Sequence, residues 1–583
     1  MKKTLALILA LVLIAAMFAG CADSSSNGGT TATPTPAGNS GTSDNTPSDG
    51  GGEDSQPVDD GPYNMAYGKF ELNADGYADA EFEYELPLST TDEVFSYWTT
   101  CWTPQHIPEG GLQELETLAY IEELTGVHME YEAVTSENRS TNFSVLLAAD
   151  DLRDVMDQAV FFYTGDAYSM IDDGWFINFY DYREYMPNYL YHLYARNDID
   201  VLKYGRLDDT TWPAMYGLVK SPMAAIGYML RQDWMDDLGL GNAIDVKTLD
   251  QWHNVLTAFK NNGVQWPLAI YETVDICGGF SMFNTSVSVS DAGLPAAKII
   301  DGTVYYSLTT QDDLDAVTLL SQWYSEGLID PNYSSYGDNT LMSNPITTDV
   351  LGCVAFTPSE VGSWEASSID PDTKWLPTPY VRKTEDQILQ YGHKKGNFHA
   401  GNASISTKCE NPELVCTWLD WKWSPYGSYV DNWGLEGFTY TINENGEEQL
   451  TDFVINHPDG LGSAWVMVLY TNDGLRQPCL NDHLRMYAYP GGEIFLEMFE
   501  AWQVPDYGGE YDLPTGISYT TEQYEILNTY SNDIGTFIAE NWFGFLDGSR
   551  PLSEWDSYVD TIYDMGIQNC IDVVQEAYEA YIA

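Results

Sequence analysis

The chain has few basic residues. Its 583 residues include 24 Lys and Arg against 88 Asp and Glu, so the formal net charge at pH 7 is −64. A surface of that charge repels nucleic acid and anionic lipid, so we exclude nucleic-acid binding and membrane-surface binding by the folded part. Solubility, or adaptation of the source organism, is enough to explain the acidity. The charge also argues mildly against strongly anionic ligands.

Motifs of several enzyme classes are absent. The sequence has no His-Glu-x-x-His, no Gly-x-Ser-x-Gly, no phosphate-binding Gly-x-x-x-x-Gly-Lys-Ser/Thr and no dinucleotide-binding Gly-x-Gly-x-x-Gly that opens a helix after a strand. The eight histidines are scattered. A glycoside hydrolase needs only two carboxylates at the right separation, so this class stays open as an alternative.

Cysteine and metal-binding patterns are weak. Seven cysteines follow Cys21, none of them forms a Cys-x-x-Cys pair, and only Cys409 and Cys416 are close in sequence. An odd number at irregular spacings does not indicate a disulfide framework or a zinc site. Residues 71–79 resemble part of a calcium loop, but the twelfth position is Phe82 instead of the glutamate that such a loop needs. We therefore expect no metal and no cofactor.

The N-terminus carries an apolar run. Lys2 and Lys3 precede the apolar residues 5–18, and small residues lead to Cys21. This order is typical of an export signal, and the run is shorter than the ~20 residues of a membrane span. Phe18-Ala-Gly-Cys21 is similar to a bacterial lipobox, with Phe18 where leucine is usual. We predict a lipoprotein signal peptide over 1–20 and lipidation of Cys21, and an ordinary secretory signal is the alternative.

A segment of low complexity follows the signal. Residues 21–61 are mostly Ser, Gly, Thr, Pro, Asn and Asp, with almost no large apolar side chain. Such a segment buries too little apolar surface to offset its ordering entropy, so we predict a disordered tether. Loss of Lys2 and Lys3 with the signal would change the formal charge of −64 to −66.

Strands and helices alternate after the tether. The apolar patterns predict strands over 93–98, 127–132 and 151–156, and helices over 112–125 and 142–149. This alternation predicts helices packed on a mostly parallel sheet. Ligands of such sheets bind at the loops that follow the carboxyl ends of the strands.

Short segments between residues 84 and 583 follow an order typical of one family. They include Tyr-Glu-Leu-Pro-Leu-Ser-Thr at 84–90 and Leu-Leu-Ala-Ala-Asp at 146–150, and further segments at 174–179, 186–190, 231–239, 248–252, 324–331, 411–413, 418–420, 434–437 and 555–558. Together they resemble the large Firmicute-type members of extracellular solute-binding protein family 1, the substrate-capturing lipoproteins of ABC sugar importers. Arg153 replaces a proline that is usual in this family.

The resemblance implies an α/β, two-lobed, periplasmic-binding-protein-like fold of type II within residues 62–583. The N-lobe would combine about 84–222 with 400–432, and the C-lobe about 223–399 with 433–583. Hinge crossings are expected near 220–230, 398–406 and 432–439. A ligand bound in the cleft between the lobes would drive closure only through its better affinity for the closed form.

The sequence is rich in aromatic residues, which make up 14% of it and include 18 Trp and 41 Tyr. A pyranose ring is well held by flat aromatic side chains and by polar groups around its rim. For each aromatic residue, core packing is the alternative. The ligand-binding residues that we predict in the cleft are Trp98, Trp102, Tyr163, Tyr271, Glu272, Asp275, Trp364, Trp433 and Glu436.

The sequence thus predicts a receptor that catalyses no reaction. It would be a monomer, lipid-anchored at the extracellular face of the cell membrane. Its ligand would be a carbohydrate, an oligosaccharide more than a monosaccharide, that it delivers to the permease subunits of an ABC transporter. Peptides and other polar oligomers stay open as ligands. A surface glycoside hydrolase and a carbohydrate-binding adhesin or sensor without a transport role are the alternative functions.

Overall fold

A computed structural model describes residues 61–583, except 165–166, 197, 221–226, 270–282, 284–296, 334–344, 357–360, 390–397, 472–476, 504–510 and 515. The chain divides into Met1–Gln56 and a compact unit, Pro57–Ala583, and the fold below is that of the compact unit. The signal segment, Cys21, Tyr271, Glu272 and Asp275 lie outside the described residues. No helix within the described ranges is long and apolar enough for a membrane span.

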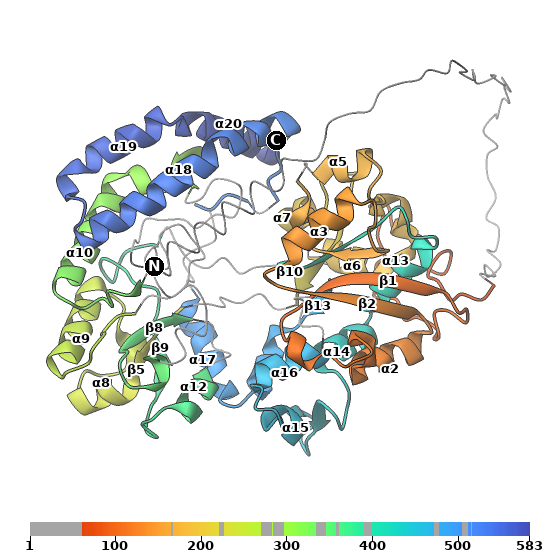
Figure 1. The fold of residues 1–583 in the computed structure, drawn as a ribbon, viewed down its shortest axis with the longest axis horizontal. Coiled ribbons are helices and arrows are strands. Elements are labelled where there is room, and N and C mark those ends of the chain that lie inside the picture. The colour runs from red at the N-terminus through yellow and green to blue at the C-terminus, as the bar shows by residue number, and fades with distance from the viewer. Residues whose placement is uncertain are drawn as a thin grey trace, which may run out of the picture. The chain divides into compact units, whose positions relative to one another are not determined.

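The first sheet of the compact unit has six strands. They are β1 (Val94–Cys101), β2 (His128–Thr135), β3 (Val155–Asp157), β4 (Met215–Val219), β10 (Phe398–Ile405) and β13 (Leu480–Asn481). Their order is β13-β4-β10-β3-β1-β2. β1 is parallel to β2 and β3, and β13 is parallel to β4, whereas β10 is antiparallel to both of its neighbours. The carboxyl ends of five strands therefore lie at one edge of this sheet, which we call the carboxyl edge (Figure 1).

Helices from two stretches of the chain accompany this sheet. They are α2 (Glu116–Thr125), α3 (Arg139–Ala148), α4 (Ala159–Phe162), α5 (Ala167–Asp172), α6 (Pro187–Ala195), α7 (Ile199–Tyr204), α13 (Pro412–Trp421) and α14 (Pro425–Trp433). The helix predicted over 112–125 is divided in two. A 3-10 turn at Leu112–Glu114 precedes α2, because Leu115 between them has an extended backbone. The other predicted strands and the 142–149 helix are present with shifted ends.

The second sheet has three strands, β5 (Gly227–Arg231), β8 (Cys353–Phe356) and β9 (Trp375–Pro377), in the order β8-β5-β9 (Figure 1). Both of its pairs are antiparallel, so the expectation of a mostly parallel arrangement holds only for the six-stranded sheet. Two short hairpins add β6 (Ala297–Ile300) with β7 (Thr303–Tyr306), and β11 (Tyr440–Ile442) with β12 (Glu448–Leu450).

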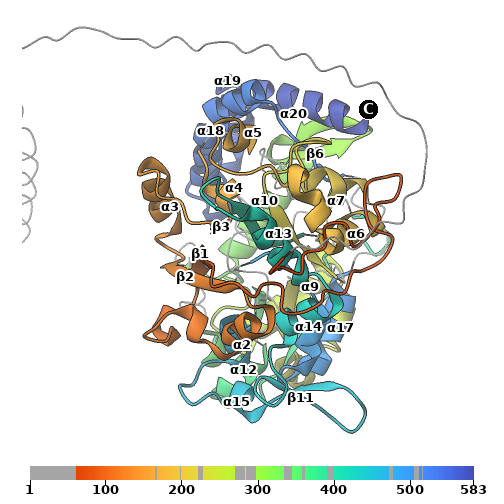
Figure 2. The same ribbon diagram turned by 90° about the vertical axis from the view of Figure 1, so that its right-hand side faces the viewer.

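The remaining helices follow in two groups along the chain. They are α8 (Gln232–Leu238), α9 (Leu249–Asn261), α10 (Gln311–Ser325), α12 (Val361–Ser367), α15 (Asp452–Ile455), α16 (Ser463–Tyr470), α17 (Gly492–Trp502), α18 (Thr521–Asp547), α19 (Trp555–Asp564) and α20 (Ile567–Ile582). Helices α9, α10 and α18 each begin with a capping box, in which Thr248, Thr310 and Thr520 satisfy backbone N–H groups of the first turn. Figure 2 shows α18, α19 and α20 lying together.

Each sheet has its own large hydrophobic core. The core at the six-stranded sheet includes Tyr97, Leu190, Leu218 and Trp418. The core at the three-stranded sheet draws on residues 228–389 and 433–577. Leu480 is an exception in sequence order, because it belongs to the first core although it follows residue 433. The chain therefore returns to the first sheet at β13 before it forms α17–α20 in the second part.

A buried ion network joins the end of β5 to its neighbours. The Arg231 side chain is fully buried, and its Nε and Nη2 donate to the two carboxylate oxygens of Asp233 at 2.9 and 2.7 Å. Its Nη1 donates to Oδ1 of Asp349 at 2.8 Å. The guanidinium carbon lies 3.9 Å from the ring centre of Trp234. This network fixes the start of α8 against the three-stranded sheet.

Six cysteines are described, at positions 101, 353, 409, 416, 479 and 570, and all are buried. Burial raises the pKa of the Cys409 thiol to about 12 and that of Cys416 well above the usual range. Both are therefore unreactive apolar groups of the core at neutral pH.

Candidate functional site

Side chains from three segments meet at the carboxyl edge of the six-stranded sheet. Trp102 directly follows β1, Gln158 follows β3, and Arg139 is the first residue of α3. The guanidinium carbon of Arg139 lies 5.4 Å from the ring centre of Trp102 and 5.5 Å from that of Phe162. Its Nη1 donates to Oε1 of Gln158 at 3.2 Å. We call Trp102, Arg139, Gln158, Phe162 and Asn402 the edge cluster.

The backbone of Gln158 connects this cluster to β10. Gln158 adopts a left-handed conformation, with φ of 56°, where β3 changes into α4. Its N–H donates to the carbonyl oxygen of Asn402 at 2.8 Å, and its own carbonyl accepts from the N–H of Phe161 at 2.9 Å. A side chain at positive φ costs free energy and occurs preferentially at functional sites. Here the strained residue places its amide beside Arg139.

Two side chains of the edge cluster have buried polar atoms without a hydrogen-bond partner. Asn402 is 1% exposed, and neither Oδ1 nor Nδ2 of its amide has a partner. The Nε1 of Trp102 is also buried and unpartnered. Buried polar groups are nearly always hydrogen-bonded, so such atoms indicate a place where a ligand or water supplies the missing bond. The edge cluster therefore combines aromatic surface with two unused donors and one unused acceptor.

A small apolar core packs against Phe162 of the edge cluster. Trp98 is fully buried in it, its Nε1 donates to Oδ1 of Asn142 at 2.7 Å, and its ring meets that of Phe162 edge-on at 6.0 Å. The structure thus places Trp98 in a core, which was the alternative considered for each aromatic residue. Tyr163 packs at the margin of the same core, and its hydroxyl donates to Asp173 at 3.3 Å. Phe161 is 54% exposed beside them.

The other predicted site residues that the structure describes lie away from this edge. Trp364 lies on α12 and is nearly buried in the core of the three-stranded sheet. Trp433 ends α14 in the same core, with its ring 5.9 Å from Tyr440. Glu436 is exposed in the turn that follows, where it forms a single bridge with Tyr440. Of the nine predicted ligand-binding residues, the structure brings together Trp98, Trp102 and Tyr163.

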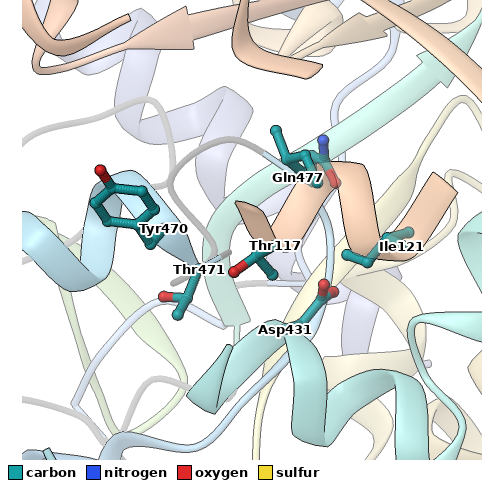
Figure 3. Close-up of a pocket in the computed structure, with 7 residues that line it drawn as sticks. Thr117, Ile121, Asp431, Tyr470, Thr471 and Gln477 are labelled. Atoms are coloured by element: carbon teal, nitrogen blue, oxygen red, sulfur yellow. The ribbon is translucent and has the colours of Figure 1, made fainter. Parts of the chain in front are cut away.

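A small closed cavity lies between α2, α14 and α16 (Figure 3). Its lining includes Thr117, Asp431 and Gln477, and it has room for about one water molecule. Nζ of the buried Lys422 lies 2.7 Å from Oδ1 of Asp431. This cavity is too small for a sugar and belongs to the packing of these helices.

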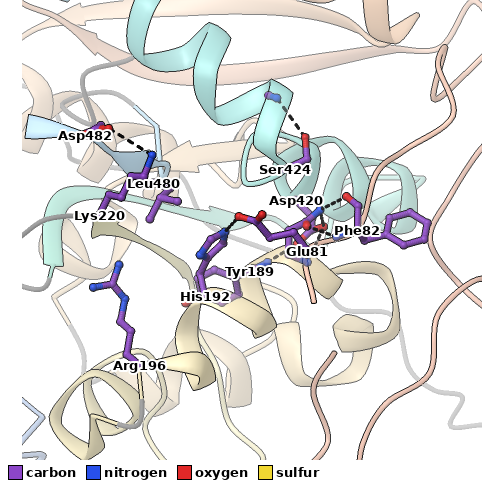
Figure 4. A network of polar contacts seen from close by, with 12 residues as sticks. Glu81, Phe82, Tyr189, His192, Arg196, Lys220, Asp420, Ser424, Leu480 and Asp482 are labelled. Atoms are coloured by element: carbon purple, nitrogen blue, oxygen red, sulfur yellow. Dashed lines mark hydrogen bonds and ion pairs between the residues drawn. The ribbon is translucent and has the colours of Figure 1, made fainter. Parts of the chain in front are cut away.

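A larger hollow of about 520 Å³ opens between α6, α14 and β13. His192, Arg196 and Lys220 line it (Figure 4). His192 Nε2 lies 3.1 Å from Glu81, Lys220 Nζ lies 3.4 Å from Asp482, and Arg196 Nη2 donates to the carbonyl of Val219 at 2.7 Å. Nε2 of His192 and Nε of Arg196 are nevertheless buried without a hydrogen-bond partner.

Burial shifts the pKa values of two ionisable groups near this hollow. The pKa of His192 is lowered to about 4 by burial and then by the charges of Arg196 and Lys220. The pKa of Asp420 is raised to about 7 by complete burial, although its carboxylate accepts hydrogen bonds from Tyr84, Asn188 and Tyr189. These bonds attach the segment around Tyr84 to the start of α6, so Asp420 has a structural role.

The described residues contain no group of three or more His, Cys, Asp or Glu side chains that could hold a metal ion. In the segment 71–79, Oδ1 of Asn73 accepts from the N–H of Asp75 at 3.0 Å, and Nδ2 of Asn73 donates to Asp79 at 2.8 Å. The side chains of this segment therefore bond to one another and form a turn.

Sequence analysis missed three members of the edge cluster. Arg139 stands in a polar run just before the helix predicted over 142–149, and such a run does not by itself indicate a binding residue. Gln158 follows a strand of a mostly parallel sheet, so the rule on strand ends could have identified it. Asn402 is an amide in the strand Phe-His-Ala-Gly-Asn-Ala-Ser-Ile, and a polar side chain buried in a strand needs a partner.

The chain was compared with known proteins at three levels, and no family model matches it. A curated relative is the fructooligosaccharide ABC transporter substrate-binding protein FusA of Streptococcus pneumoniae serotype 4. It is 21% identical over 417 residues, which cover 69% of this chain and 75% of FusA.

Solved structures of solute-binding proteins share the fold. An extracellular solute-binding protein from Bifidobacterium longum subsp. infantis superposes with a TM-score of 0.67 at 15% identity, over 88% of this chain and 100% of the other. The alginate-binding protein AlgQ2, in a structure without calcium ion, gives a TM-score of 0.64 at 19% identity, over 84% of this chain and 99% of the other. The chain therefore has the two-lobed α/β fold of the solute-binding proteins, which confirms the resemblance found in the sequence.

Proposed function

We propose that this protein is a receptor that captures an oligosaccharide in the cleft between two lobes and delivers it to the permease subunits of an ABC transporter. The edge cluster carries this proposal. It presents aromatic side chains and unpartnered buried polar atoms at the carboxyl edge of a sheet, where ligands of such sheets bind. The similarity to FusA over 69% of the chain, together with the shared fold, supports the same function.

The proposal includes a division into lobes. The N-lobe combines about 84–222 with 400–432, and the C-lobe combines about 223–399 with 433–583. The separate cores at the two sheets support this division, and the return of β13 to the first sheet adds Leu480–Asn481 to the N-lobe. Trp364 and Trp433 would serve the C-lobe side, together with Tyr271, Glu272, Asp275 and Glu436.

The proposal also includes an anchor. Cys21 would be lipidated after cleavage of residues 1–20, and the segment 21–61 would tether the compact unit to the extracellular face of the cell membrane. Two or three acyl chains anchor firmly, whereas one does not. Mass spectrometry of the N-terminal peptide tests this part, and a Cys21→Ala variant should leave the membrane fraction. If Cys21 is unmodified, or if the mature chain begins at another residue, the N-terminal segment is an ordinary secretory signal and not a lipoprotein signal.

The first experiment is a thermal-shift and calorimetric titration of the compact unit, residues 57–583, with oligosaccharides that include fructooligosaccharides. A ligand at a hundred times its Kd adds about 2.7 kcal/mol to the free energy of unfolding. We expect one glycan family to raise the midpoint and to be recovered intact. Shortened products would favour the glycoside hydrolase, and absence of any shift would oppose the receptor function.

A matched pair of variants tests the position of the site. Trp102→Ala should weaken binding of the same glycan, because it removes an aromatic face and a donor from the edge cluster. Tyr191→Ala, in the hollow between α6 and α14, should leave binding unchanged. The reverse result would move the binding site to that hollow.

A further inference from the structure

The charge state of the edge cluster carries information about the ligand. No carboxylate among the described residues forms an ion pair with Arg139, which contacts Gln158 and two aromatic rings. Arg153 and Arg231, by contrast, each pair with two carboxylates.

The guanidinium of Arg139 is also held in place. It lies over Trp102 and Phe162, and the bond from Nη1 to Gln158 fixes its orientation. The Arg139 side chain is partly exposed, so its other N–H groups stay available to a ligand. A fixed planar guanidinium with free N–H groups is well suited to bind a carboxylate or sulfate through two parallel hydrogen bonds.

The neighbouring polar atoms are mainly donors. Nε1 of Trp102 and Nδ2 of Asn402 are buried donors without partners, Oδ1 of Asn402 is a buried acceptor without a partner, and the edge cluster contains neither Asp nor Glu. Together with the N–H groups of Arg139, donors therefore outnumber acceptors in the edge cluster. A ligand group that accepts hydrogen bonds and carries negative charge fits the guanidinium and these donors.

We infer that the oligosaccharide carries an acidic group, a carboxylate or sulfate, and that Arg139 binds this group at the edge cluster. This inference rests on the proposed function and adds the class of the ligand. The net charge of −64 would repel an acidic ligand, but salt screens charges that lie more than about 8 Å away at physiological ionic strength. The nearby guanidinium of Arg139 therefore affects the affinity for the bound acidic group more than the distant surface charges do.

The test compares acidic oligosaccharides with uncharged forms of the same sugars. The compact unit is titrated with tri-galacturonate, tri-mannuronate, sialyllactose and a chondroitin tetrasaccharide, each beside its methyl ester or desulfated methyl ester, and with neutral fructooligosaccharides. We expect one acidic probe to bind at least about tenfold more tightly than its ester, because a hydrogen bond to a charged group is lost in the ester.

Two variants assign this difference to Arg139. Arg139→Gln should weaken binding of the acidic probe by at least about tenfold and leave binding of its ester within twofold. Arg153→Gln is the matched control, since Arg153 is a partly exposed arginine outside the edge cluster, and it should change neither. A thermal midpoint within a few degrees of the parent shows that the Arg139 variant is folded, and Arg139→Lys should recover part of the preference.

The experiments distinguish failure of this inference from failure of the proposed function. Binding of neutral glycans only, or equal loss of both probe forms in the Arg139 variant, overturns the acidic ligand and leaves the receptor function intact. Binding of no oligosaccharide at all removes the proposed function and the inference with it.

Discussion

Arg231 gives the sharpest prediction about stability. Replacing it with Met keeps the length and apolar character of the side chain and removes the charge that faces Asp233 and Asp349. Their side chains are 14% and 25% exposed, so two poorly solvated carboxylates would remain without a partner. Removal of one partner from a buried ion pair costs about 3–5 kcal/mol, mostly because a charge stays buried and unpaired. We expect a loss of that size for Arg231→Met.

Arg153 provides the matched control. It also contacts two carboxylates, Glu132 at 2.6 Å and Asp151 at 3.1 Å, but these are 37% and 65% exposed. Pairs at the surface contribute about 0–1 kcal/mol, so Arg153→Met should cost no more than that. A triple variant, Arg231→Met with Asp233→Asn and Asp349→Asn, should recover at least half of the loss because no unpaired charge remains.

Calorimetric and urea unfolding of the compact unit measure these effects. Because each sheet has its own core, unfolding can occur in more than one transition, and the Arg231 variant should lower the transition of the three-stranded part. A loss below 1 kcal/mol, or one equal to that of the Arg153 variant, would refute the argument from burial. Failure of the triple variant to recover would show that packing against Trp234, and not unpaired charge, sets the cost.

Further predictions concern two tryptophans and two titrating groups. Trp98→Ala should lower the free energy of unfolding by about 3–5 kcal/mol because Trp98 is fully buried. Trp102→Ala should mainly weaken glycan binding, by at least about tenfold. If the two variants have equal effects on unfolding and on glycan titration, these assignments are wrong. Asp420 has a pKa raised from 3.8 to about 7, so the folded protein holds a proton that the unfolded chain releases between these values. Its contribution to stability therefore falls as pH rises from about 4 to 7, on the order of 4 kcal/mol in all, and Asp420→Asn should remove this slope in urea unfolding at several pH values. The pKa of His192 is lowered from 6.5 to about 4, so stability should fall as pH decreases through this window, and His192→Gln should abolish that dependence; an unchanged profile would show that His192 is solvated.

Much of the local structure followed from the sequence because it depends on neighbouring residues. The apolar residues in 93–98 predicted β1, and the helical spacing in 112–125 predicted α2, since both patterns reflect burial of neighbouring side chains. The extended Leu115 was missed, because a single residue that interrupts a helix leaves the apolar spacing unchanged. The segments similar to solute-binding proteins indicated the two-lobed fold, which the structural comparisons confirm.

Positions that depend on contacts between distant segments did not follow from the sequence. Trp98 and Trp102 are four residues apart on one strand and its loop. Trp98 lies in a core because apolar residues of α3 and α4 pack around it, whereas Trp102 meets the guanidinium of Arg139 in the edge cluster. Asn402 comes next to Gln158 only through the antiparallel pairing of β10 with β3. The antiparallel three-stranded sheet and the return of β13 to the first sheet depend on long-range pairing in the same way.

By itself, the sequence determined the acidity of the chain, the class of fold and the abundance of aromatic side chains. These properties depend on composition and on local patterns along the chain. Only the tertiary structure decided which aromatic residues lie at the carboxyl edge and that, among the described residues, no carboxylate pairs with Arg139 there. Burial and ion pairing are set by segments far apart in the chain, so they become defined only when those segments pack together.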